Sequence, residues 1–394
     1  MKRMPTTLRD EAAIVGIGQT TYTKNSGVSE LALAVECVSK AIDDAGLEPS
    51  QIDGYTSFTL DTNDEVDIAR GVGSGEATFF SRIGYGGGAA IGVIHQAAMA
   101  LATGQAKYVV CFRALNGRSG QRYSQGVSGN IVTSDLVHWS WYMPWGLMTP
   151  ASWVAMFTQR YMYDTGCKAE DLAEVAIATR NHAVNNPAAF FHERPLSLDD
   201  YMKARWIAEP LRLYDCCQET DGGCAVVLTT PERARDCAQP AALVRGVAQA
   251  FAADQEQMTS FYNRDISRLP EMEIVAKNMW ETAGLGPQDI DAAIFYDAFT
   301  SIVLFQLEAF GFCGFGEAKD FVKDGALSAQ GGRLPTNTHG GQLSEAYIHG
   351  VNGIAEGTRL IRGTSTNQPK KNDHVLVTSG VGVPTAGMVL GKLG

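Results

Sequence analysis

The sequence predicts an α/β protein built from two related halves. With 394 residues, the chain exceeds the size of one ordinary core, so two units are expected. A hydrophobic content of 45% with 19% charged residues is typical of a globular protein. The run Ala45-Gly-Leu-Glu-Pro-Ser-Gln-Ile-Asp53 recurs as Ala283-Gly-Leu-Gly-Pro-Gln-Asp-Ile-Asp291. In each copy a glycine ends an amphipathic helix and a strand follows.

A second pair of segments repeats in the same order. Tyr85-Gly-Gly-Gly88 opens an apolar helix that leads to a strand at Tyr108–Phe112. His339-Gly-Gly341 opens a helix that leads to a strand at His374–Thr378. Two copies of a strand–helix–strand unit indicate a duplicated α/β domain. We therefore expect an N-terminal half, 1–237, that starts with a strand at Ala12–Ile17, and a C-terminal half, 238–394, that starts with one at Ala242–Val247.

The first half carries an insertion at about 115–221. It holds most of the tryptophans and a helical pattern near Asp171. An insertion of this kind is typical of a lid or a substrate wall, and the equal alternative is a contact between subunits.

The stretch from Ile83 to Ala106 contains no charged residue. Glycines and polar side chains interrupt it, so the sequence favours a buried core helix over a membrane span.

Charge and cysteine content narrow the class of protein. The net charge of −11 argues against nucleic acid as a partner but permits an anionic ligand held by backbone amides. The eight cysteines lack zinc-site spacing, so no metal site and a cytoplasmic, reduced protein are expected. The basic start, Met1–Met4, is not followed by an apolar segment, so no targeting signal is expected.

Three segments in order carry a resemblance to a known family. They are Tyr296–Cys313, Gly331–Asn337 and Ser344–His349. With the duplicated halves and the glycine loops, the chain resembles the thiolase superfamily over its full length. Within it, the chain is most similar to the sterol-carrier and lipid-transfer branch that includes steroid side-chain-cleaving aldolases. The resemblance implies two similar five-stranded halves in a layered α-β-α-β-α core.

The four catalytic loops of a thiolase are changed in this chain. The position of the nucleophilic cysteine is Tyr85, and the Asn-Glu-Ala-Phe or His-Asp-Cys-Phe loop becomes Tyr296–Phe299. The Gly-His-Pro histidine becomes Tyr347, and the C-terminal Cys-x-Gly becomes Thr378–Gly380. Both cysteines of covalent acyl transfer are absent, so thiolysis from these positions is not expected.

Phenols at these positions suit proton transfer without a covalent intermediate. We predict Tyr296 and Tyr347 as the catalytic pair, with His349 or Asp297 sharing the work. Which tyrosine is the base stays open, and a tyrosine with an ordinary pKa of about 10 needs help to act as one. Packing roles are the alternative for both tyrosines, since Tyr296 ends an apolar strand and Tyr347 is expected in a helix that begins near Ser344. Asp297 is favoured to hold backbone amides at the start of the next helix.

The glycine loops are the predicted substrate-binding elements. The residues are Tyr85, Gly86, Gly87, His339, Gly340 and Gly341. The helix N-termini beside the two glycine pairs favour a phenolate and can hold the enolate oxygen. The alternatives are that Tyr85 fills the space of the lost cysteine and that His339 is a loop residue without a direct role.

The resemblance implies a lyase that performs retro-aldol cleavage of a β-hydroxyacyl-CoA. The expected substrate is a 17-hydroxy-steroid C22-oyl-CoA, and the products are a 17-ketosteroid and propionyl-CoA. Two alternatives are a thiolase with a displaced cysteine, such as Cys111 or Cys313, and a non-catalytic lipid or acyl-CoA carrier. No cofactor bound by the chain is expected, since CoA is part of the substrate. Expected partners are a second copy and a separate DUF35-type subunit with an OB fold and a zinc ribbon, giving a heterotetramer.

Overall fold

The computed structural model describes residues 7–84, 88–120, 122–125, 140–255, 261, 265–380, 382 and 385–394. Its centre is a nine-stranded mixed sheet with the order β3-β2-β4-β7-β1-β8-β11-β10-β9. A separate two-stranded sheet pairs β5 with β6. The strands are β1 Ala13–Gln19, β2 Gly54–Phe58, β3 Phe79–Ile83, β4 Tyr108–Asn116, β5 Trp206–Ala208, β6 Leu211–Arg212, β7 Asp221–Thr229, β8 Ala242–Ala250, β9 Ala292–Ile294, β10 His374–Ser379 and β11 Thr385–Lys392.

The duplication is visible in the sheet. Strand β2 runs parallel to β3 and β4 in the first half, as β9 runs parallel to β10 in the second. In each half two antiparallel pairings follow, β4–β7–β1 and β10–β11–β8. The two first strands, β1 and β8, join the halves through the antiparallel pairs Ala13–Leu243 and Ile14–Ala242.

The second half has four strands in the described part of the chain, where five were predicted. A single parallel bridge between Ala293 and Thr336 occupies the fifth position. The neighbouring Pro335 has no backbone N–H, so this segment cannot continue as a regular hydrogen-bonded ladder.

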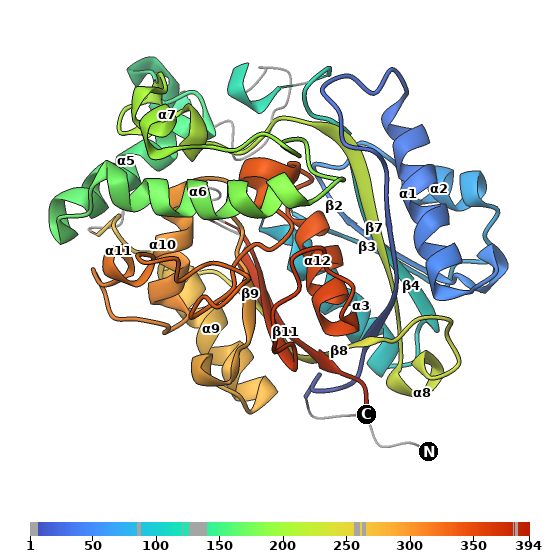
Figure 1. Ribbon diagram of the computed structural model, residues 1–394. Helices are drawn as coiled ribbons and strands as arrows, with labels where there is room; N and C mark the ends of the chain where they lie inside the picture. The colour runs from blue at the N-terminus through green and yellow to red at the C-terminus, as the bar shows by residue number, and fades with distance from the viewer. Residues whose placement is uncertain are drawn as a thin grey trace.

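Helices form three layers around the two halves of the sheet (Figure 1). Helices α1 and α2 cover the outer face of the first half, and α9 and α10 cover the outer face of the second. Helices α3 and α12 lie between the halves and contact strands of both. This arrangement confirms the predicted α-β-α-β-α layering. The helices are α1 Glu30–Ala45, α2 Glu65–Val72, α3 Ala89–Ala102, α5 Pro150–Thr165, α6 Ala169–Asn185, α7 Leu198–Lys203, α8 Pro231–Ala234, α9 Pro270–Ala283, α10 Thr300–Ala309, α11 Ala318–Phe321 and α12 Val351–Arg362.

Strand β4 shows how the sequence builds the layers. Val109 and Cys111 pack into the middle layer against α3, whereas Val110 and Phe112 pack into the outer layer against α1. A strand that alternates between two apolar layers is hydrophobic at nearly every position, which explains its apolar run.

The uncharged stretch from Ile83 to Ala106 contains the core helix α3, as predicted. None of the helices in the described ranges is long and apolar enough to cross a membrane.

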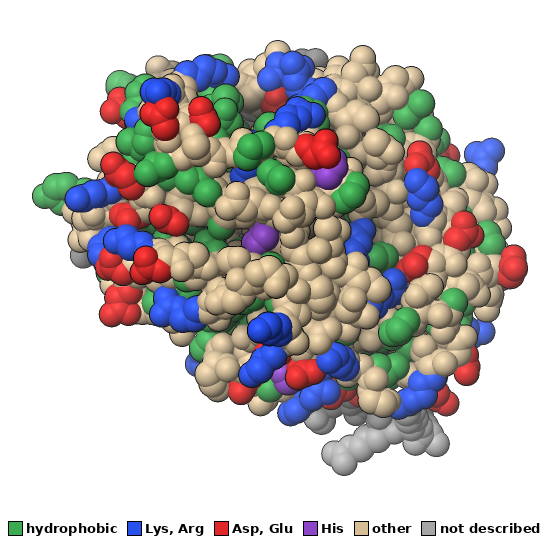
Figure 2. All heavy atoms as spheres, in the orientation of Figure 1, with side chains coloured by type: hydrophobic (Ala, Val, Ile, Leu, Met, Phe, Trp, Pro, Cys, Tyr) green, Lys and Arg blue, Asp and Glu red, His purple; other side chains and the backbone are tan. Residues whose placement is uncertain are grey.

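The insertion of the first half packs on the second half. The Thr158 hydroxyl of α5 bonds to the Ser301 hydroxyl of α10 at 2.7 Å. On α6, Arg180 Nε donates to Ser344 Oγ at 3.0 Å, close to the second glycine loop. Of the tryptophans in the insertion, Trp139 lies outside the described residues, and Trp141 and Trp145 are exposed. On the face that Figure 2 shows, acidic and basic side chains are interspersed.

Candidate active site

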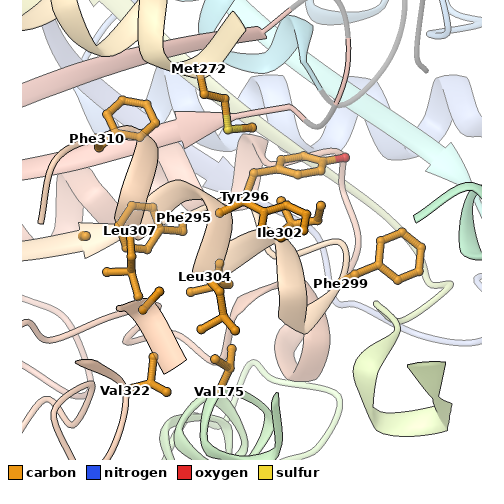
Figure 3. Packing of buried hydrophobic residues seen from close by; sticks show 14 of the residues in the cluster. Val175, Met272, Phe295, Tyr296, Phe299, Ile302, Leu304, Leu307, Phe310 and Val322 are labelled. Atoms are coloured by element: carbon orange, nitrogen blue, oxygen red, sulfur yellow. The ribbon is translucent and has the colours of Figure 1, made fainter. Parts of the chain in front are cut away.

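The structure brings Tyr296 and Tyr347 together. Tyr296 follows the end of β9, and Tyr347 lies between the second glycine loop and α12. Their hydroxyl oxygens are 3.1 Å apart, which is hydrogen-bonding distance. Figure 3 shows the Tyr296 ring at the end of an apolar cluster, with its hydroxyl directed away from Phe295 and Leu304. The apolar ring is therefore packed and its polar tip lies next to the second phenol.

Backbone hydrogen bonds fix the position of Tyr296. Its N–H donates to Thr378 Oγ1 at 3.0 Å, and its carbonyl accepts from Gln306 Nε2 at 2.9 Å. The Thr378 hydroxyl in turn donates to Gln306 Oε1. Thr378, which lies near the end of β10 where a thiolase has its C-terminal cysteine, thus helps to hold the phenol.

Gly350 packs against the ring of Tyr296. A Cβ atom on this glycine would lie 3.0 Å from Tyr296 Cδ2, and its φ of 86° is in the left-handed region. Both conditions favour glycine at this position.

Tyr347 lies in a loop, so the predicted helix start near Ser344 is wrong. Gly341–Glu345 forms a short π-helical turn, Ala346 is extended, and the helix begins at Val351. The chain takes positive φ at His349 and Gly350, which a right-handed helix does not allow. The Tyr347 N–H donates to Thr220 Oγ1 at 2.9 Å, so the end of the insertion helps to hold this loop.

His349 joins the phenol pair through Tyr347. The two rings meet edge to face, with 4.7 Å between their centroids. His349 Nδ1 accepts a hydrogen bond from Arg113 Nε at 3.0 Å. Burial and the positive charge of Arg113 lower the pKa of His349 well below 6.5, so the imidazole is neutral near pH 7.

Asp297 does not hold the start of the following helix, as had been favoured. Its carboxylate accepts hydrogen bonds from the backbone N–H groups of Gln342, at 2.8 Å, and Leu343, at 3.4 Å. Burial raises its pKa to about 6, against the opposing effect of those backbone donors. A Cβ atom on Gly341 would lie 1.9 Å from Asp297 Oδ2, so the carboxylate and the glycine loop are packed directly together. This contact gives Asp297 a structural role in shaping the loop.

His339 belongs to a different cluster. It lies with Glu345, Glu356 and Arg359 along a cavity of about 250 Å³, and its Nε2 is 3.8 Å from Glu345 Oε2. Burial lowers the pKa of His339 to about 3 and raises that of Glu345 to about 8. The adjacent Gly340 packs against Ala183 of α6. The predicted substrate-binding role of His339 stays a prediction, and Tyr85, Gly86 and Gly87 lie outside the described residues.

The cysteines named for a displaced thiolase nucleophile are poorly suited to that role. Burial raises the pKa of Cys111 to about 12, and burial with nearby carboxylates raises that of Cys313 to about 12. A thiol held protonated at neutral pH is a weak nucleophile. All eight cysteines are free thiols.

Three residues of the site were not predicted from the sequence: Arg113, Asp61 and Thr220. Arg113 lies in the middle of an apolar strand, and its side chain is buried. A charged residue in such a run needs a buried partner, so its position was the available signal. The partners themselves, Asp61 and His349, are distant in the sequence and could not be named from it.

Comparisons with known proteins agree with this architecture. A protein-family model described as Thiolase C-terminal domain-like matches residues 252–391. A steroid side-chain-cleaving aldolase of Thermomonospora curvata is 57% identical over 382 residues, covering 96% of this chain and 97% of that protein. A 17-hydroxy-3-oxo-4-pregnene-20-carboxyl-CoA lyase of Mycobacterium tuberculosis is 53% identical, covering 98% of this chain and 100% of that protein.

Solved structures show the same relationship. An Ltp2-ChsH2(DUF35) aldolase has a TM-score of 0.94 and 56% sequence identity, covering 98% of this chain and 99% of that chain. An acetyl-CoA acetyltransferase from Syntrophomonas wolfei has a TM-score of 0.68 at 13% identity, covering 98% and 100%, and supports the fold alone. The chain therefore has the thiolase fold and belongs to the family of thiolase-like steroid side-chain-cleaving aldolases.

Proposed function

We propose that this protein is a retro-aldolase that cleaves a 17-hydroxy-steroid C22-oyl-CoA into a 17-ketosteroid and propionyl-CoA. The observation that carries the proposal is the hydroxyl pair of Tyr296 and Tyr347, at 3.1 Å, in the place of a thiolase's catalytic groups. The names of two relatives above 50% identity describe the same chemistry on the same class of substrate.

The reaction needs one base and one acid. A base removes the proton of the 17-hydroxyl group, and the C17–O bond becomes a carbonyl as the C17–C20 bond breaks. The electron pair of that bond moves to C20 and forms the enolate of the CoA thioester. An acid then delivers a proton to C20, which gives propionyl-CoA. Atoms and electrons balance without a further reactant, so the reaction uses CoA only as part of its substrate.

The phenol pair suits this proton traffic. When one hydroxyl loses its proton, the other donates a hydrogen bond to the resulting phenolate, and charge-assisted bonds of this kind are strong. The phenolate is thus stabilised within the pair until it takes the proton of the 17-hydroxyl group. We assign the base and acid roles to Tyr296 and Tyr347 jointly, and single substitutions distinguish which is which.

The proposed assembly has two parts. The Ltp2-ChsH2(DUF35) aldolase is a 56% identical neighbour, which supports a separate DUF35-type subunit as a partner of this chain. We further propose that two copies of the chain pair and bind two such subunits as a heterotetramer. We also propose a cytoplasmic location, which the eight free thiols support.

A cleavage assay tests the function. The purified chain, with and without a DUF35-type subunit, is incubated with 17-hydroxy-3-oxo-4-pregnene-20-carboxyl-CoA, and products are followed by mass spectrometry. We expect the 17-ketosteroid and propionyl-CoA in equal amounts without added free CoA. A strict requirement for free CoA would indicate thiolysis and overturn the proposal. Binding without any product in both arms would indicate a carrier.

A further inference from the structure

Arg113 connects the site to a buried ion pair. Its side chain is 2% exposed and leaves β4 among apolar neighbours. It donates from Nη1 to Asp61 Oδ2 at 3.1 Å and from Nε to His349 Nδ1 at 3.0 Å. The same Nη1 also reaches the carbonyl oxygen of Ala114 at 3.1 Å. One guanidinium therefore links a buried carboxylate to the imidazole beside the phenol pair.

The carboxylate of Asp61 is itself held rigidly. Its Oδ1 accepts from the backbone and side-chain nitrogens of Asn63, at 2.8 and 2.7 Å. Its Oδ2 accepts from the backbone N–H of Ala114 at 3.0 Å, in addition to Arg113. A carboxylate with this many donors has one orientation, so it fixes the guanidinium that bonds to it.

The donor at Arg113 determines where His349 carries its proton. Arginine keeps all its N–H groups in proteins and cannot accept a hydrogen bond. The imidazole nitrogen that faces it, Nδ1, must therefore present a lone pair, and the proton of a neutral ring is on Nε2. Nε2 lies on the other side of the ring from Arg113.

The backbone and the aromatic neighbours hold this ring in place. His349 has a φ of 49°, a conformation that a residue with a Cβ adopts only where its surroundings impose it. Phe58 meets the imidazole edge to face at 5.8 Å, and the Arg113 guanidinium lies 5.5 Å from the same phenyl ring. The charged and titratable groups that face the imidazole in the described ranges are Arg113, with Asp61 behind it, and Tyr347.

We propose that Asp61 and Arg113 are positioning residues that keep His349 as a neutral Nε2–H donor beside the two phenols. In this role the imidazole stabilises a developing oxygen anion, and it takes no proton from the substrate. The inference rests on the proposed retro-aldol function and adds two residues, from β4 and from the loop after β2, to its machinery.

Histidine NMR tests the tautomer without any assay of activity. The protein is labelled with ¹⁵N-histidine, and the His349 signal is assigned by its loss in His349→Gln. We expect an unprotonated Nδ1 and a protonated Nε2 across about pH 5.5–8.5. In Arg113→Met the donor that faces Nδ1 is gone while burial still lowers the pKa of His349, so the same signal should show a mixture of Nδ1–H and Nε2–H tautomers. An Nδ1–H tautomer in the unmodified protein would overturn the proposal, as would an unchanged signal in Arg113→Met.

A second variant guards against misfolding. Arg113→Met alone leaves Asp61 as an unpaired buried charge, which is strongly destabilising. The double variant Asp61→Asn/Arg113→Met removes both charges at similar volume and should fold more stably. It should give the same altered His349 signal. If it keeps the original tautomer, the ion pair is not what sets the proton position.

A kinetic cycle tests whether Arg113 acts through His349. We expect Arg113→Met to lower kcat by about 10- to 100-fold with little change in KM, as is typical when an orienting partner is lost. In the His349→Gln background, whose amide donates without a tautomer choice, the same substitution should cost less than about threefold. Equal losses in both backgrounds would mean a role independent of His349. Should the unmodified protein fail to cleave the steroid, the proposed function fails, while the NMR result still decides the tautomer.

Discussion

The hydroxyl groups of Tyr296 and Tyr347 lie 3.1 Å apart, although 51 positions of sequence separate the two residues. The backbone N–H of Tyr296 donates a hydrogen bond to the Thr378 hydroxyl, and that of Tyr347 donates to the Thr220 hydroxyl. The threonines come from opposite halves of the chain, so the phenol pair depends on both.

Removal of either hydroxyl should impair turnover and leave the fold intact. Tyr296→Phe and Tyr347→Phe retain the packed rings, and proton transfer groups typically contribute about 10²–10⁴-fold. We expect each variant to lower kcat by about that factor, measured by steady-state kinetics with thermal melts as the control. The double variant should lose less than the product of the two, because both groups serve one proton transfer unit. Near-normal kcat in both single variants would make the phenols structural.

Substitution of Gly350 should affect both activity and stability. In Gly350→Ala the new Cβ would press on the Tyr296 ring from 3.0 Å at a φ of 86°. We expect a lower melting temperature and a kcat reduced by about 100-fold, since small displacements of reacting groups are costly. Gly363→Ala is the matched control, because Gly363 ends the same helix at a φ of 75° with its nearest neighbour 3.9 Å away. It should lower stability through its positive φ alone, and so by less than Gly350→Ala does, and it should keep kcat. Equal kcat in the two variants would contradict the packing role of Gly350.

Glu345 should make the protein less stable as the pH rises. Burial raises the pKa of this carboxyl from 4.5 to about 8, so the folded state binds a proton that the unfolded state releases between those values. Its contribution to stability is complete below pH 4.5 and is lost as the pH rises through 8. The slope from one such group is at most about 1.4 kcal/mol per pH unit.

Denaturant unfolding at several pH values measures this effect. Glu345→Gln cannot titrate, so its free energy of unfolding should fall less steeply than that of the unmodified protein between about pH 5 and 8. At low pH the variant should be less stable than the unmodified protein, because Asn186 and Asn352 donate to both carboxylate oxygens and one of them would meet an amide NH₂. The test compares how steeply the free energy of unfolding changes with pH in the two proteins, and does not use the difference in its absolute value. Parallel slopes would show that Glu345 is ionised in the folded protein.

Cysteine substitutions should leave catalysis intact. Cys111→Ala removes a buried thiol whose pKa is raised to about 12, and Cys313→Ala removes another. We expect kcat within about threefold for both, with a loss of stability at the fully buried Cys111 of the size that small cavities cause. A folded cysteine variant with a kcat lower by orders of magnitude, or an acyl-enzyme found by mass spectrometry, would restore the thiolase mechanism.

The sequence predicted the elements that local chemistry determines. Glycines such as Gly46 and Gly284 end helices in the left-handed conformation, and the strands that follow are marked by apolar runs. The prediction of a fifth strand in the second half was wrong because Pro335 has no backbone N–H to donate to a ladder. The repeat pattern does not reveal the effect of this single residue. The prediction of a helix from Ser344 was wrong because His349 adopts a positive φ. A histidine in the sequence does not by itself indicate this conformation.

Half of the candidate site was also predictable. The tyrosines stand at motif positions, so the resemblance placed them. Arg113 and His349 are 236 positions apart, and no local pattern encodes a hydrogen bond over that distance. The same holds for Asp297, whose sequence neighbours suggested a helix cap while its hydrogen bonds go to a loop 45 positions away.

The packing of the insertion has a consequence for how the protein is assembled. Residues of α5 and α6 belong to the first repeat but share a core with α9 and α10 of the second. A polypeptide that begins at residue 238 would expose the apolar faces of α9 and α10 to water. One that ends at residue 237 would expose the apolar faces of α5 and α6. We therefore expect that the two halves do not fold as independent units. Separately expressed fragments should be insoluble alone and recover a common structure only when they are produced together.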